Sequence, residues 1–322
     1  MFAFFSAVSS AISWFLVRYF GFTVMFYLLS SVSPLAGFVA RVLASIMALI
    51  GCALYGVCAS IVLRLSGGDR WQISQWATAR AFKYSMALVT GLTFEIEDPK
   101  NVLRTARPAV FVGNHQTELD VLMLGCMFPQ YCSVTAKRQL RNYPFLGWFM
   151  SLSGTIFIDR ANSKDARSAM SGAANAIQSQ RQSVYMFPEG TRSYAQEAML
   201  LPFKKGAFHL AVQAGSPVVP VVVANYSHLY APAKFRFLPG RVPIKVLDPI
   251  PTTGLTPDDV SALTERVRDA MLQEIGPLTL KGRAWALAAA SKGKPMPVAV
   301  PVPTVAEPAA PASNGVSTGV AL

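Results

Sequence analysis

The chain has 322 residues, of which 52% are hydrophobic and 14% are charged, and its formal net charge is +12. So apolar a composition excludes an ordinary soluble enzyme. The positive charge suits anionic lipid headgroups or phosphorylated substrates, whereas the lack of a long Lys/Arg tract argues against nucleic-acid binding.

The apolar residues are concentrated at the N-terminus, where two uncharged stretches follow one another. Tyr19–Ala40 and Val42–Leu63 are each long enough to cross a hydrocarbon core of about 30 Å as a helix. Pro34 interrupts the first stretch, so two full spans and a hairpin that enters and leaves by the same face both fit the sequence. We therefore expect residues 1–64 to form a membrane anchor of two or three helices or a hairpin.

A bridging segment, residues 65–107, follows the anchor. Arginine and lysine outnumber acids directly after the apolar stretches, with only Asp69 opposing them. By the positive-inside rule this bias predicts that the rest of the chain faces the cytosol. Trp71, Trp76 and Tyr84 are amphipathic side chains that suit a membrane surface.

From residue 108 onward, short apolar runs rich in β-branched residues alternate with helical patterns. We expect strands at Ala109–Gly113, Ser133–Ala136, Thr155–Ile158, Val184–Phe187, Val218–Val223 and Ile244–Leu247. We expect helices at Glu118–Phe128, Gln139–Ser151, Lys164–Gln180, Gly206–Gln213 and Asp258–Glu274. This alternation predicts an α/β fold, a mixed sheet flanked by helices, behind the N-terminal membrane-anchoring segment.

Two further segments complete the predicted organisation. The catalytic domain is expected to span residues 108–280, and the Ala/Pro-rich residues 281–322 are expected to be disordered because their composition cannot build a core. Within the domain, Phe145–Ile158 is long for one buried strand. It fits a core segment, a segment that dips into one leaflet, or a mixture of the two.

The first candidate site is the motif Asn114–Asp120, which follows the predicted strand Ala109–Gly113. His115 and Asp120 would point about 140° apart on one helix, so His115 must lie in the loop and Asp120 in the first turn or two of the next helix. The carboxylate can then orient the imidazole and stabilise its cation while the other nitrogen takes a proton from an alcohol. Simple helix capping also fits this short motif.

The second candidate site is the motif Phe187–Ser193, which again follows a predicted strand. Gly190 allows the backbone to turn, and the planar guanidinium of Arg192 matches a phosphate group. A plain surface turn with a solvated Glu and Arg fits the motif equally well when it stands alone.

Together these motifs and two others give the chain a resemblance to a known family. In chain order, the four blocks are Asn114–Asp120, Gly154–Arg160, Phe187–Ser193 and Val219–Val222. The chain resembles the 1-acylglycerol-3-phosphate acyltransferases, a family of membrane-bound glycerolipid acyltransferases. The likeness covers residues 45–275 and is strongest to the fungal enzymes.

The resemblance implies roles for particular residues. His115 and Asp120 would be catalytic, with His115 as general base. The residues implied in binding the phosphoglycerol acceptor are Arg160, Glu189, Gly190, Thr191, Arg192 and, as a further cation, Lys137. The donor would be acyl-CoA, with no cofactor. Four cysteines without a CxxC pair and only three histidines predict no metal site.

The activity implied is acyl transfer to the sn-2 hydroxyl of lysophosphatidic acid. The alternatives are the same chemistry on glycerol-3-phosphate or a lysophospholipid, and a non-catalytic membrane protein that binds anionic lipid. The expected location is the membrane of the endoplasmic reticulum or the surface of a lipid droplet, with the catalytic domain in the cytosol. The oligomeric state is left open, and so are roles for Glu118, Lys204 and Lys205.

Overall fold

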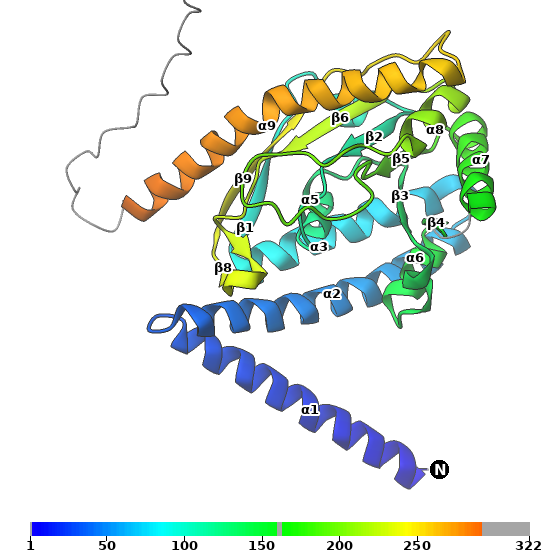
Figure 1. Cartoon of the computed structure of the whole chain (residues 1–322). Coiled ribbons are helices and arrows are strands. Elements are labelled where there is room, and N and C mark those ends of the chain that lie inside the picture. Colours follow the sequence, from blue (N-terminus) through cyan, green and yellow to red (C-terminus); the bar gives the residue numbers. More distant parts are fainter. Residues whose placement is uncertain (1, 160–162, 292–322) are drawn as a thin grey trace, which may run out of the picture.

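A computed structural model describes residues 2–159 and 163–291 (Figure 1). Two long N-terminal helices, α1 (Phe2–Leu29) and α2 (Pro34–Leu65), precede an α/β domain. In Figure 1, α1 projects away from this domain, whereas α2 runs along its lower side. By length and composition, residues 6–29 and all of α2 are suited to cross a membrane.

The turn between these two helices, residues 30–33, lies inside the first uncharged stretch. Ser33 caps α2 by accepting a hydrogen bond from the backbone N–H of Ala36 at 3.3 Å, and Pro34 occupies the first helical position. Proline is well tolerated there because the N–H that it lacks would have no helical partner. Pro34 therefore begins a helix instead of interrupting one, and Arg41, expected between the two apolar stretches, lies inside α2.

Helix α2 joins the apolar segment to the domain. It packs against α3 (Ser74–Thr90) and α6 (Leu146–Leu152). Arg41 Nε donates to the carbonyl of Thr90 at 3.1 Å, and the Arg64 guanidinium donates to the carbonyl of Leu152 at 2.7 and 3.0 Å. Both ends of α2 are thus tied to the domain.

The stretch predicted as a single helix at Gln139–Ser151 is divided in the structure. A 3-10 helix, η2 (Arg138–Asn142), is separated from α6 by Pro144, which cannot continue a helix. In α6, Met150 is buried and Trp148 is 55% exposed. This helix therefore has a buried face and an exposed apolar face, and insertion into a leaflet stays a prediction.

The domain is built on a seven-stranded sheet with the order β1-β9-β6-β2-β5-β3-β4. The strands are β1 (Leu92–Glu97), β2 (Val110–Gly113), β3 (Cys132–Lys137), β4 (Ile156–Ile158), β5 (Ser183–Met186), β6 (Val218–Val223) and β9 (Gly240–Val246). Neighbouring strands are parallel except β6 and β9, which are antiparallel. The predicted mixed sheet flanked by helices is confirmed.

Helices cover both faces of the sheet. Helices α3 and α5 (Asp120–Met127) pack on the face toward α2, and α7 (Ser163–Gln180), α8 (Gly206–Ala214) and α9 (Val260–Ser291) pack on the other (Figure 1). Every residue of β2, β5 and β6 is buried. The remaining short elements are α4 (Val102–Thr105), η1 (Gly68–Ile73), η3 (Pro232–Lys234), η4 (Pro257–Asp259), β7 (Tyr230–Ala231) and β8 (Arg236–Phe237).

The domain extends beyond its expected bounds at both ends. Strand β1, in the segment expected to be a bridge, pairs with β9 and buries Leu92 and Phe94, so the sheet begins upstream of residue 108. Helix α9 continues through Pro277 to Ser291 because Ile275 and Leu278 are buried on either side of the proline. Residues 281–291 are therefore helical, and the rest of the predicted disordered tail lies outside the described residues.

Candidate active site

The two sequence motifs meet at one edge of the sheet. Strands β2 and β5 are parallel neighbours, so the loops that follow them leave from adjacent positions. The backbone N–H of Ser193 donates to the carbonyl of His115 at 3.0 Å, and that of Tyr194 donates to the carbonyl of Gln116 at 3.1 Å. The carboxyl edge of an α/β sheet is where such sites usually form.

His115 and Asp120 form the pair that their spacing predicts. His115 lies in the loop after β2, Asp120 is the first residue of α5, and Nδ1 of the histidine lies 2.7 Å from Oδ2 of the aspartate. The Asp120 side chain is 1% exposed and that of His115 is 20% exposed. The structure records no hydrogen bond to Nε2 of His115 from any residue it describes, so this nitrogen is open to a substrate proton.

Asp120 is held by groups from two distant parts of the chain. Its Oδ2 accepts hydrogen bonds from the backbone N–H groups of Gln116 at 2.6 Å and Thr117 at 3.1 Å. Its Oδ1 accepts a hydrogen bond from the hydroxyl of Tyr226 at 2.7 Å. A buried carboxylate needs such donors, because removal from water otherwise penalises its charge.

Tyr226 is a residue of the site that the sequence did not reveal. Burial, reinforced by the charge of Asp120, raises its pKa well above the usual range, so the side chain remains a hydrogen-bond donor. Because its single proton goes to Asp120, the Thr117 hydroxyl, 2.7 Å away, must donate to the tyrosine oxygen. Tyr226 lies 106 residues beyond Asp120, and no local pattern links the two.

The His115 ring and its loop are fixed from the second motif. The ring stacks on Phe187 with centroids 4.1 Å apart and planes 18° apart. Glu189 is buried, with Oε1 accepting from the backbone N–H of His115 at 2.7 Å and Oε2 from that of Leu201 at 3.0 Å. Burial raises the pKa of Glu189, and these two hydrogen bonds oppose the shift. Glu189 thus faces the loop backbone.

The other predicted binding residues lie at different depths. Gly190 has a φ of 71°, and a Cβ there would lie 2.9 Å from the side-chain carbons Cδ and Cε of Lys204. Thr191 and Arg192 are exposed beside it, and Lys137 is exposed at the end of β3, on the same edge of the sheet. Arg160 lies outside the described residues.

Glu118 and Lys205, whose roles the sequence left open, make defined contacts. Glu118 Oε1 lies 2.7 Å from Nη1 of Arg192, and the hydroxyl of Tyr194 contacts both side chains. Lys205 Nζ donates to Ser261 Oγ at 2.7 Å, which directs this lysine toward α9. Neither motif showed that Arg192 would meet Glu118, because the two lie 74 residues apart.

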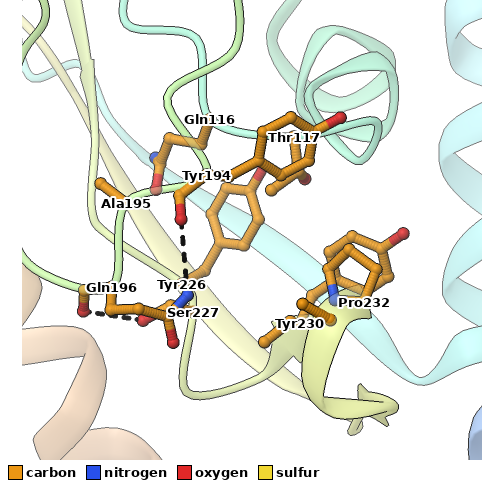
Figure 2. A pocket seen from close by; sticks show the side chains of 11 residues that line it. Gln116, Thr117, Tyr194, Ala195, Gln196, Tyr226, Ser227, Tyr230 and Pro232 are labelled. Carbon is orange, nitrogen blue, oxygen red and sulfur yellow. Dashed lines mark hydrogen bonds between the residues drawn. The ribbon is translucent and has the colours of Figure 1, made fainter.

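A cavity of about 230 Å³ lies beside Gln116, Thr117 and Tyr226 (Figure 2). Figure 2 shows the rings of Tyr194, Tyr226 and Tyr230 around it, with Thr117 at its upper end. Burial and the nearby charge of Glu118 raise the pKa of Tyr230 to about 12, so its phenol is neutral. Within residues 2–159 and 163–291, no group of three His, Cys, Asp or Glu side chains is placed to hold a metal ion.

Known proteins share both the sequence and the fold. A model of the acyltransferase family matches residues 93–224. The 1-acyl-sn-glycerol-3-phosphate acyltransferase of Saccharomyces cerevisiae is 44% identical over 234 residues, 72% of this chain and 76% of the yeast protein. The human alpha form is 45% identical over 178 residues, 55% of this chain and 62% of its own.

A solved structure has a similar fold. The 1-acyl-sn-glycerophosphate acyltransferase of Thermotoga maritima matches with a TM-score of 0.55 and 23% identity, over 80% of this chain and 96% of that one. The solved structure shares the fold, and the similarity to the yeast enzyme, with the matching family model, defines the class of protein as an acyltransferase. The chain belongs to the 1-acyl-sn-glycerol-3-phosphate acyltransferase family, which its motifs resemble.

Proposed function

We propose that this protein transfers an acyl group from acyl-CoA to the sn-2 hydroxyl of lysophosphatidic acid, producing phosphatidic acid for phospholipid and triacylglycerol synthesis. The observation that carries the proposal is the His115–Asp120 pair at 2.7 Å, with a buried carboxylate and a partly exposed imidazole, in a loop that is hydrogen-bonded to the second motif at Ser193. The names of the yeast and human relatives supply the acceptor.

The chemistry needs one base and no acyl-enzyme intermediate. Nε2 of His115 takes the hydroxyl proton as the alkoxide oxygen attacks the thioester carbonyl, forming the new C–O bond. The C–S bond then breaks, and the imidazolium returns its proton to the leaving thiolate of coenzyme A. Asp120 stabilises the imidazolium between these steps and keeps its ring in place. Acyl-CoA is consumed as a co-substrate, and no other cofactor enters the reaction.

The phosphate of the acceptor is assigned to the loop that begins at Gly190. Arg192 offers a planar fork of donors, and the Gly190 backbone and Thr191 hydroxyl lie next to it. Glu189 accepts a hydrogen bond from the backbone N–H of His115 and so ties the His115 loop to the loop that begins at Gly190. Lys137 and Arg160 are proposed as additional cations for the same phosphate.

The proposed location is the endoplasmic reticulum membrane or a lipid droplet, with the α/β domain on the cytosolic side. Large apolar side chains on α1 and α2 are exposed, including Trp14, Phe15, Phe20 and Tyr55. Such exposure on long apolar helices suits contact with lipid, where the acceptor also lies. The basic residues that follow α2 support the orientation.

The test is a comparison of acceptors with one acyl-CoA donor. Membranes containing the protein are assayed with lysophosphatidic acid, glycerol-3-phosphate and lysophosphatidylcholine, and the acylated position in each product is determined. We expect the highest kcat/KM for lysophosphatidic acid, with the acyl group at sn-2. A preference for another acceptor would reassign the substrate, and no transfer to any acceptor would favour the non-catalytic lipid-binding alternative.

A further inference from the structure

The proposed phosphate-binding arginine already has an anionic partner within the chain. Glu118 Oε1 lies 2.7 Å from Arg192 Nη1, and Arg192 Nη1 donates to the Tyr194 hydroxyl at 3.2 Å. The same hydroxyl contacts Glu118, so the three side chains form a closed cluster. The guanidinium group is therefore engaged by a carboxylate before any acceptor arrives.

This cluster lies at the mouth of the site. Glu118 belongs to the first motif, between His115 and Asp120, and Arg192 belongs to the second. Tyr194 also lines the cavity next to Thr117 and Tyr226 (Figure 2). A phosphate that binds Arg192 through both Nη atoms must meet the Glu118 carboxylate at Nη1.

An arriving phosphate can displace Glu118 from Arg192. The Glu118 side chain is 46% exposed and that of Arg192 is 41% exposed, and ion pairs with this exposure are weak because water screens both charges. A phosphomonoester carries about 1.5 to 2 negative charges near neutral pH, against one for a carboxylate, and it matches the arginine fork. A phosphate therefore competes effectively with Glu118 for the guanidinium.

We propose that Glu118 is a built-in competitor that guards Arg192 and sets the KM for the phosphate-bearing acceptor. Every anion that binds Nη1 of Arg192 must displace the same carboxylate, so each loses affinity by the same factor. A lysolipid offsets this loss through its acyl chain, whereas inorganic phosphate has no comparable contact. Both affinities fall by the same factor, so lysolipid at concentrations above its KM still fills the site, whereas the more weakly bound phosphate does not. This inference rests on the proposed function, because that function places the phosphate at Arg192.

The experiment replaces Glu118 with glutamine, which keeps the shape of the side chain and removes its charge. KM for lysophosphatidic acid, KM for acyl-CoA and inhibition by inorganic phosphate are measured for the wild type and E118Q. We expect KM for lysophosphatidic acid and Ki for phosphate to fall by a common factor of roughly two to five. KM for acyl-CoA should stay unchanged.

Glu197→Gln is the matched control. Glu197 also forms an exposed ion pair with an arginine, Arg283, at 3.2 Å. Because this variant removes the same charge outside the cluster, it should change neither KM for lysophosphatidic acid nor Ki for phosphate. Equal effects of the two variants would show a general electrostatic effect and overturn the guard. An unchanged or higher KM in E118Q would overturn it too, as would a fall confined to acyl-CoA.

A binding measurement separates this inference from the proposed activity. Addition of inorganic phosphate to the detergent-solubilised full chain should raise the thermal midpoint more for E118Q than for the wild type, since binding to the folded state stabilises it. Equal shifts would contradict the guard whether or not the enzyme turns over. Absence of turnover by the wild type, with a larger shift in E118Q, would contradict only the proposed function.

Discussion

At the scale of single residues, the site depends on how Asp120 is held. The carboxylate accepts two backbone N–H groups from its own loop and the hydroxyl of Tyr226, besides its contact with His115. The loop contacts follow from a motif in which an acid begins a helix. The tyrosine contact depends on β6 lying beside β2, which only the assembled sheet establishes.

The Tyr226 hydroxyl gives a test at this scale. In Tyr226→Phe the ring and its edge-on contact with Phe94 remain, whereas the hydrogen bond to Asp120 and the one from the Thr117 hydroxyl are lost. We expect kcat to fall about tenfold, because a hydrogen bond to a charged group contributes about 1.5–3 kcal/mol. KM values should change less than kcat.

Tyr230→Phe is the control for this prediction. Tyr230 lines the same cavity, but among the described residues it donates no hydrogen bond to Asp120. Steady-state kinetics of both variants would decide the matter. An equal loss of kcat in Tyr230→Phe and Tyr226→Phe would contradict a specific role of the Tyr226 hydroxyl.

At the scale of elements, the sequence was most informative where burial leaves a simple pattern. The fully buried strands β5 and β6 appear as continuous runs of apolar residues, and the observed β6 has the predicted ends. Strand β1 was missed because its alternating sequence, Leu-Thr-Phe-Glu-Ile-Glu, directly follows an amphipathic helix. The pairing of Glu118 with Arg192 was equally hidden, since it arises only when the two loops lie side by side.

The anchor shows a second limit of pattern reading. The two uncharged stretches meet at Arg41, whereas α2 begins at Pro34, where Ser33 caps it. Helix capping is a local feature of the sequence, but here the capping residue lies within a long uncharged stretch and is not distinguished from it. Contacts of Arg41 with the domain are long-range and leave no pattern in the sequence.

Two glycines of α2 test its packing against the domain. A Cβ at Gly56 would lie 2.5 Å from the Phe149 ring and 2.8 Å from the Thr78 hydroxyl, whereas one at Gly51 would meet nothing within 4 Å. We expect Gly56→Ala to lower the free energy of unfolding by about 1–3 kcal/mol through overpacking, and therefore to lower the thermal midpoint in detergent. Gly51→Ala should leave it unchanged or raise it, since alanine favours a helix by about 0.5–1 kcal/mol. Equal midpoints would contradict this packing.

At the scale of the whole molecule, α2 connects the apolar N-terminal segment to the domain that carries the site. Helix α2 is tied to the domain at Thr90 and Leu152, while α1 projects beyond it with exposed apolar side chains (Figure 1). In the proposed enzyme, such a tie keeps His115 at a fixed position relative to the membrane that contains the lysolipid. The family and the mixed α/β fold could be predicted from sequence motifs, whereas this tie could not.

The most direct test of the central claim is the rate of phosphatidic acid formation from lysophosphatidic acid and acyl-CoA, measured for the wild type and His115→Ala. We predict a fall of at least about 100-fold, because a positioned general base contributes about 10²–10⁴ to the rate. His209→Ala, which alters an exposed histidine on α8, should retain the wild-type rate. Comparable rates for the wild type and the His115 variant would contradict the assignment of the base.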